Sequence, residues 1–220
     1  MSIFEFATVA VSLILGLAVA CLLQSAVGAF QARRRCRLDW LPFLWAALIL
    51  LHQFQFWWAL YELNAAPALS LWTFMVLLYL SGLLFVAAAL IFPDPGSDYP
   101  DDLGRYFAAD GSWGAGAVAV YNLSAVGANA VIFHAPVMDA ANLANLVLAC
   151  LAGFVALTRV RKLHTAATLV YAVLFLFGAM SASSTSYDST ATVREVTDYL
   201  AGDNAGGADV RARTRWSMPG

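Results

Sequence analysis

Charged residues are scarce in this sequence, and no basic residue lies inside a long apolar run. Of the 220 residues, 12% are charged and 61% are hydrophobic, whereas soluble domains are about 25% charged. The lysines and arginines cluster at residues 33–37, at residues 159–162 and near the C-terminus, with Arg105 alone between the first two clusters. Because a cation at the centre of a bilayer costs at least about 2.5–3.5 kcal/mol, this placement argues against a soluble domain and predicts a membrane protein.

The usual motifs of enzymes, redox proteins and nucleic-acid-binding proteins are also missing. The cysteines Cys21, Cys36 and Cys150 form no C-x-x-C pair, which argues against a disulfide framework and a thiol-redox site. The sequence has no H-E-x-x-H, G-x-S-x-G, Walker A or G-x-G-x-x-G pattern, so we assign no catalytic, cofactor-binding or metal-ligating residue. With only 12 basic residues and a formal net charge of −2, no nucleic acid partner is expected.

What the sequence does contain is apolar segments long enough to cross a bilayer, which takes about 20 residues. The start MSIFEF has no positive segment, and its apolar run continues through Phe30, which favours an uncleaved first helix over a signal peptide. The links are mostly short, which favours antiparallel neighbours. We therefore expect an all-α fold, a bundle of six transmembrane helices within residues 1–183. The six spans are Phe4–Phe30, Leu41–Leu63, Ala68–Phe92, Trp113–Ala135, Ala140–Thr158 and Thr165–Ser183.

The basic residues also predict how the bundle is oriented. If residues 33–37 are cytoplasmic, six spans place Arg105 and residues 159–162 on the same side, and the outer links 64–67 and 136–139 carry no basic residue. Omitting the fourth span would move residues 159–162 outside, against the bias of lysine and arginine toward cytoplasmic loops. We therefore expect both the N-terminus and the C-terminus to be non-cytoplasmic, although Arg194 near the last span favours the opposite side.

Two regions outside the spans are polar. Residues 93–112 carry five aspartates and one arginine, which fits a solvated acidic loop better than a Ca²⁺ or Mg²⁺ site, because the EF-hand spacing is missing. Within it, Leu103, Tyr106 and Phe107 at helical spacing predict a short helix lying in the headgroup region. Residues 184–220 form a polar tail that we expect to be mostly disordered, with a short helix near residues 193–201 after the capping box at residues 192–195.

The second span carries an unusual stretch, HQFQFWWALYEL, at residues 52–63. At about 100° per residue, Gln55 falls near His52 on one polar stripe, whereas Gln53 lies outside that stripe. His52 is close to the mid-plane, where an ionisable residue is a functional hypothesis. The alternative is that His52 and Gln55 only form hydrogen bonds between helices. The aromatic residues that follow are expected to mark the outer interface; they are Trp57, Trp58 and Tyr61.

The fourth span carries Asn122 and Asn129, which are seven residues apart and share a helix face. Either they pack a central helix through hydrogen bonds, or they face His52 and Gln55 across a small cavity. Bis-histidine haem is disfavoured, because His52, His134 and His164 are predicted at the middle, outer and inner levels of the membrane.

The strings QFQFWWAL, LWTFMVLLYL and LIFPD, followed by DDLGRYF, resemble those of a group of small bacterial multi-pass membrane proteins. The resemblance covers about residues 33–113. It implies a multi-pass protein of the bacterial inner membrane, and it carries no activity and no site residue.

These observations leave three functional hypotheses. The first is a non-enzymatic inner-membrane protein, an accessory or scaffold subunit that associates with the lipid bilayer and with other membrane-protein subunits or itself. The alternative is a small transporter or channel, with a weakly polar mid-membrane path lined by His52, Gln55, Asn122 and Asn129. The second alternative is a quinone- or pigment-binding protein with its ligand near His52 and the tryptophans. A transporter predicts a cavity that His52 and Asn129 reach.

Overall fold

The computed structural model describes residues 3–63, 70–94, 99–132, 136 and 138–185, and this part of the chain is helical with no strand. Six helices are long, and they are α1 Ile3–Gln31, α2 Trp40–Leu63, α3 Leu71–Leu90, α5 Ser112–Ile132, α6 Ala140–Leu157 and α7 Arg161–Thr185. Three short elements lie between them: the 3₁₀ turn η1 Ala32–Arg34, the helix α4 Leu103–Tyr106 and the π-helical turn η2 Phe107–Gly111. The prediction of an all-α bundle is confirmed.

Six stretches of the described chain are long and apolar enough to cross a membrane. They coincide with the six predicted spans to within a few residues, except that the fourth is longer. It runs without a break from Leu103 to Ile132, because α4 and η2 continue directly into α5. The chain is therefore a multi-pass membrane protein.

Polar side chains at the helix starts satisfy the first backbone N–H groups, as helix termini require. The Ser70 hydroxyl accepts a hydrogen bond from the Thr73 N–H at 3.1 Å and begins α3. Asp102 caps α4 in the same way, and Asp139 caps α6. These polar side chains thus set where α3, α4 and α6 begin.

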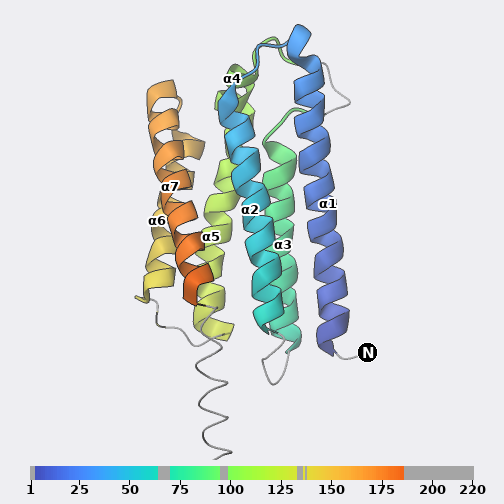
Figure 1. The fold of residues 1–220 in the computed structure, drawn as a ribbon, viewed down its shortest axis with the longest axis vertical. Helices are drawn as coiled ribbons and strands as arrows, with labels where there is room; N and C mark the ends of the chain where they lie inside the picture. Colours follow the sequence, from blue (N-terminus) through green and yellow to red (C-terminus); the bar gives the residue numbers. More distant parts are fainter. Residues whose placement is uncertain (1–2, 64–69, 95–98, 133–135, 137, 186–220) are drawn as a thin grey trace, which may run out of the picture. The chain divides into compact units, whose positions relative to one another are not determined.

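Small residues set which helices approach closely. α3 packs against α1 and α5, α6 packs against α5, and α2 packs against α1 and α3 (Figure 1). A Cβ atom added at Gly114 of α5 would lie 2.9 Å from Ile91 Cδ1 and 3.0 Å from the Ala87 carbonyl oxygen. Close approach of this kind is how helices associate in lipid, where no hydrophobic force drives them together.

The buried apolar side chains form two clusters along the bundle. One cluster includes Leu22, Ile49 and Ile91, and the other includes Leu15, Phe56 and Leu84. Large apolar side chains also cover the outer faces of the helices, for example Leu13 and Val131, which are 68% and 57% exposed. Apolar helices with such outer faces indicate contact with the lipid bilayer.

The region predicted as a solvated acidic loop differs from that expectation at its C-terminal end. The short helix is present at Leu103–Tyr106. Its apolar side chains do not lie among lipid headgroups, because Leu103 and Phe107 are buried in the larger cluster at 0% and 1% exposure. The sequence spacing identified the helix, but it did not show that the apolar face of this helix packs against the bundle.

The chain divides into two compact units after Leu176. In the second unit the described residues continue α7 from Phe177 to Thr185. The short helix predicted near residues 193–201 lies outside the described residues, as does the rest of the polar tail.

Candidate functional site

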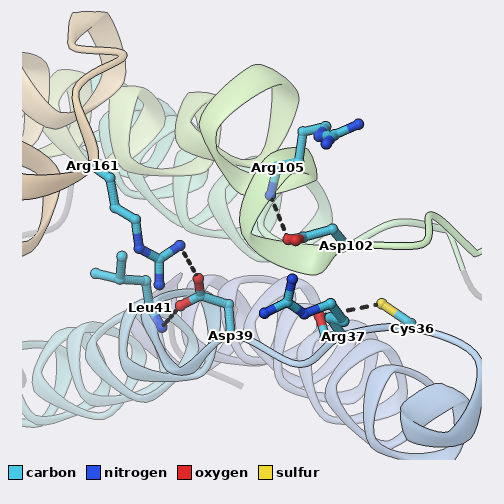
Figure 2. A network of polar contacts seen from close by, with 7 residues as sticks. All are labelled: Cys36, Arg37, Asp39, Leu41, Asp102, Arg105 and Arg161. Carbon is cyan, nitrogen blue, oxygen red and sulfur yellow. Dashed lines mark hydrogen bonds and ion pairs between the residues drawn. The ribbon is translucent and has the colours of Figure 1, made fainter.

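The end of the bundle that holds residues 33–37, 99–105 and 159–162, called the basic end below, carries a group of polar contacts (Figure 2). Asp39 stands directly before α2, and its Oδ1 accepts a hydrogen bond from the Leu41 N–H at 3.0 Å. Its Oδ2 forms an ion pair with Arg161 Nη1 at the start of α7. The Asp39 side chain is 5% exposed, whereas that of Arg161 is 63% exposed, so Asp39 is the fixed partner in this link between α2 and α7.

The backbone of Arg37 connects the same turn to α4. The Arg37 N–H donates to the Asp101 carbonyl oxygen at 2.8 Å, and the Leu103 N–H donates to the Arg37 carbonyl oxygen at 3.0 Å. Asp102 Oδ1 accepts from the Arg105 N–H at 3.0 Å (Figure 2). This hydrogen bond lowers the pKa of Asp102, because it stabilises the ionised carboxylate.

Two further contacts connect the start of α7 and the chain before it to the α4 region. The Arg159 Nη1 donates to the carbonyl oxygens of Ala108 and Ala109. The ring of His164 lies 5.6 Å from that of Phe107, and its Nε2 donates to the Val155 carbonyl oxygen at 2.6 Å. Residues 33–37, Arg105 and residues 159–162 therefore lie at one end of the bundle, as the span count predicted. This is the end at which α4 lies in Figure 1.

Halfway along α2, His52 belongs to a buried chain of hydrogen bonds between three helices. It lies 12 residues after Trp40, or about 18 Å along the helix. The His52 Nδ1 is 2.8 Å from the Leu48 carbonyl oxygen, and the His52 Nε2 is 2.9 Å from the Tyr171 hydroxyl of α7. Asn122 of α5 donates through Nδ2 to the same hydroxyl at 3.3 Å and to the Val118 carbonyl oxygen at 2.9 Å.

The partners of His52 define the direction of this chain. A carbonyl oxygen only accepts, so the hydrogen on the imidazole lies on Nδ1 and is donated to Leu48. The other nitrogen, Nε2, then accepts from Tyr171, whose oxygen accepts in turn from Asn122. In this tautomer the hydrogen bonds run in one direction, from Asn122 through Tyr171 and His52 to Leu48.

Aromatic rings enclose His52 on the sides that the hydrogen bonds leave open. The Phe175 ring stacks on the imidazole with a centroid distance of 4.1 Å and an angle of 10°. Tyr121 meets it edge-on at 5.8 Å. His52 is only 3% exposed, so its contacts hold α2, α5 and α7 together.

The structure brings only two of the four predicted interior residues together. Asn122 reaches His52 through Tyr171. Asn129 does not, because its Nδ2 donates to Asn142 Oδ1 of α6 at 2.9 Å. Gln55 is exposed. The arrangement of all four residues around one cavity is therefore not found.

The predicted interface aromatics lie at the far end of α2 from the basic end. Trp58 and Tyr61 are 58% and 71% exposed, and their rings are 5.8 Å apart. Trp57 is 40% exposed, and its Nε1 donates to the Ser12 hydroxyl of α1 at 3.0 Å.

Gln53, which the sequence analysis placed outside the polar stripe, is fully buried at 0% exposure. Neither its Oε1 nor its Nε2 has a hydrogen-bond partner among the described residues. It lies on α2 between Ile49 of one apolar cluster and Phe56 of the other. An unpaired amide in apolar surroundings is destabilising, by about 1–3 kcal/mol in mutational data.

Replacing Gln53 with leucine is therefore expected to raise the free energy of unfolding by about 1–3 kcal/mol, because the variant buries no unpaired amide. The melting temperature in detergent micelles measures this change. The matched control is Gln55→Leu, two residues further along α2 on its exposed side, which should change the melting temperature little. A lower melting temperature for Gln53→Leu would mean that the amide has a polar partner.

Two hollows on the described part of the chain lie away from His52. One is lined by Trp72, Met75 and Tyr79 of α3 with Ser124, Gly127 and Val131 of α5, among others. The other lies beside α1 and is lined by Leu23, Gln24, Val27, Gly28, Gln31 and Tyr99. Neither includes His52 or Asn129, which the transporter hypothesis required to line one cavity.

The sequence analysis missed Tyr171, which completes the central hydrogen-bond chain, and Asp39, which links two helices at the basic end. A tyrosine in the middle of an apolar span was an available signal, since a buried hydroxyl requires a partner. Asp39 directly before Trp40 was another, because aspartate is a preferred N-cap residue.

Among the described residues, no group of three or more histidine, cysteine, aspartate or glutamate side chains is placed to hold a metal ion. Comparisons of the chain with protein families, with curated proteins and with solved structures find no match.

Proposed function

We propose that the chain is a non-enzymatic protein of the bacterial inner membrane, which serves as an accessory or scaffold subunit for other membrane proteins. The observation that supports this most is the row of hydrogen bonds that runs from Asn122 through Tyr171 and His52 to Leu48. In it the Asn122 Nδ2, the Tyr171 hydroxyl and both ring nitrogens of His52 are hydrogen-bonded to groups of the same bundle. Polar side chains that bond one another in this way stabilise a bundle, and a substrate could bind them only by breaking these hydrogen bonds.

The faces available to a partner are the outer ones. Trp58 and Tyr61 at the end of α2, and Trp72 at the start of α3, expose most of their surface. Tryptophan and tyrosine supply much of the binding energy of protein interfaces, and they also anchor helices at the bilayer surface. This aromatic region, Trp58, Tyr61 and Trp72, is where we place the contact with another subunit.

The basic end is proposed to face the cytoplasm, because lysine and arginine concentrate in cytoplasmic loops. The N-terminal end of α1 lies at the opposite end of the helix and would then be non-cytoplasmic, as would the C-terminus after six spans. The variant Arg105→Cys tests this orientation, because it places a cysteine at an exposed position of the basic end. The cysteine is then labelled with a membrane-impermeant reagent. Reagent added outside intact cells should leave that cysteine unlabelled.

A photo-crosslinking amino acid at Trp58 is expected to form a crosslink to one discrete membrane protein when it is activated in native membranes. Leu17 of α1 is the control, because it is 56% exposed and lies outside the aromatic region. Mass spectrometry of the crosslinked band identifies the partner. Two results would contradict the proposal: the same weak protein crosslinks at both positions, or a stoichiometric quinone or pigment in the purified protein.

A further inference from the structure

The hollow beside α1, called the α1 hollow below, lies on an outer face of the bundle near the basic end. Its volume is about 570 Å³, within the range of small-molecule sites. Two side chains of its lining are apolar, Leu23 and Val27, and three carry hydrogen-bonding groups, Gln24, Gln31 and Tyr99. Both apolar residues are at least half exposed, so an apolar molecule can lie along them from the lipid side.

The two glutamines are unusual for a helix face in contact with lipid. Gln24 and Gln31 are exposed and seven residues apart, so they lie on the same face of α1 and about 10 Å apart along it. The Gln31 amide is at the end of the helix, and the Gln24 amide lies deeper. A polar group that faces hydrocarbon is unfavourable without a hydrogen-bond partner. The ester oxygens of a phospholipid lie just below its phosphate and can accept from these amides.

Three arginines follow Gln31 after Ala32, and they continue the chain from the Gln31 end of the α1 hollow, which is called its rim below. Arg33, Arg34 and Arg35 are all exposed, and none forms an ion pair with a described residue. The Arg33 Nη1 donates to the Phe30 carbonyl oxygen at 3.1 Å, and its guanidinium lies over the Phe30 ring. Arg34 and Arg35 therefore have their donors available for an anion at this rim.

The walls of the α1 hollow are connected to each other. The Tyr99 hydroxyl donates to the Ser25 carbonyl oxygen at 3.4 Å, and the Arg37 N–H donates to the Asp101 carbonyl oxygen. Burial raises the pKa of Tyr99, so its phenol stays protonated and neutral. The carboxylates that follow Tyr99 are Asp101 and Asp102, and Asp102 is occupied by the Arg105 N–H. Against the three positive charges of the arginine triplet stand the two carboxylates of Asp101 and Asp102, which leaves these side chains a net charge of about +1.

We propose that the α1 hollow binds an anionic glycerophospholipid. Its phosphate contacts Arg34 and Arg35, its ester oxygens accept from Gln24 and Gln31, and an acyl chain lies along Leu23 and Val27. Arginine suits this role because its planar donors match phosphate oxygens. The inference does not depend on whether the protein is a subunit, since a stand-alone bundle would bind the same lipid.

The test uses the full chain in nanodiscs with equal amounts of phosphatidylglycerol and phosphatidylcholine, from which native mass spectrometry records the lipids that stay bound. We expect the wild type to retain phosphatidylglycerol preferentially. The double variant Arg34→Gln/Arg35→Gln should lower that preference by roughly fivefold for each arginine. Gln24→Leu should lower the retention of both lipids, because both carry the same ester groups.

Two controls separate the α1 hollow from general surface charge. Arg34→Lys/Arg35→Lys keeps the charge and should keep most of the preference. Lys162→Gln removes one positive charge from the basic end outside the hollow and should leave the preference unchanged. The proposal is overturned if the wild type shows no preference for the anionic lipid. It is equally overturned if Lys162→Gln lowers the preference as much per charge as the arginine variants do.

Discussion

Replacing His52 with alanine is expected to lower the free energy of unfolding by about 3–5 kcal/mol. The change removes a fully packed ring that stacks on Phe175, and it leaves a cavity between α2 and α7. It also leaves the buried Tyr171 hydroxyl without its acceptor. A shift of the unfolding transition in detergent, followed by circular dichroism, measures the loss.

Two further variants separate packing from hydrogen bonding at this position. His52→Phe keeps the ring and the stacking but removes both hydrogen bonds, so its loss should be smaller than that of His52→Ala. Gln55→Ala changes an exposed residue of the same helix and should have little effect. An unchanged melting temperature for His52→Ala would show that the chain from Asn122 to Leu48 does not stabilise the bundle.

Replacing Gly104 with alanine is expected to lower the free energy of unfolding by about 1–3 kcal/mol. Gly104 is buried at the basic end, where an added Cβ would overlap Asp39 Oδ2 and lie 2.9 Å from Arg161 Nη1. Arg161 is long enough to move aside. Asp39 is short and held by the Leu41 N–H, so the variant must displace the carboxylate and break a link between α2 and α7. The thermal unfolding midpoint again gives the size of the effect.

Gly82→Ala in α3 is the matched control, because nothing lies within 4 Å of the Cβ it would add. Alanine favours a helix over glycine by about 1 kcal/mol, so this variant should be neutral or stabilising. A double-mutant cycle identifies the cause: Gly104→Ala should cost less when Asp39 is already alanine. Equal costs in both backgrounds would mean that the clash with Asp39 is not the reason.

The spans could be predicted because the bilayer imposes both their length and their composition. The ends of the spans were harder to predict where the helix continues into polar residues. α7 begins at Arg161, before the predicted start at Thr165, because a basic side chain near the membrane surface is compatible with a helix even though it ends an apolar run. In the same way, α5 could be recognised as a span, but not its continuation back to Leu103.

The arrangement of the polar residues could be predicted only in part. A single stripe on α2 assumes one buried face, whereas α2 packs against α1 and α3 and also contacts α7 through His52. Gln53 is therefore buried and Gln55 exposed, whereas the sequence analysis placed Gln55 beside His52 and Gln53 outside the stripe. Asn129 pairs with Asn142 because α6 is the closest neighbour of α5. Which helices are neighbours depends on packing that no single span reveals.

The contacts between α2 and α7 also bear on how the protein is made. Tyr171 follows His52 by 119 residues, and Thr168, which accepts a hydrogen bond from the Trp45 Nε1, follows Trp45 by 123. At about 5–20 residues per second, a ribosome needs roughly 6–24 s to cover that distance. During this interval α2 enters the membrane before its partners have been synthesised. A nascent chain that stops after Leu157 contains all of α2 and neither of these two hydroxyl groups.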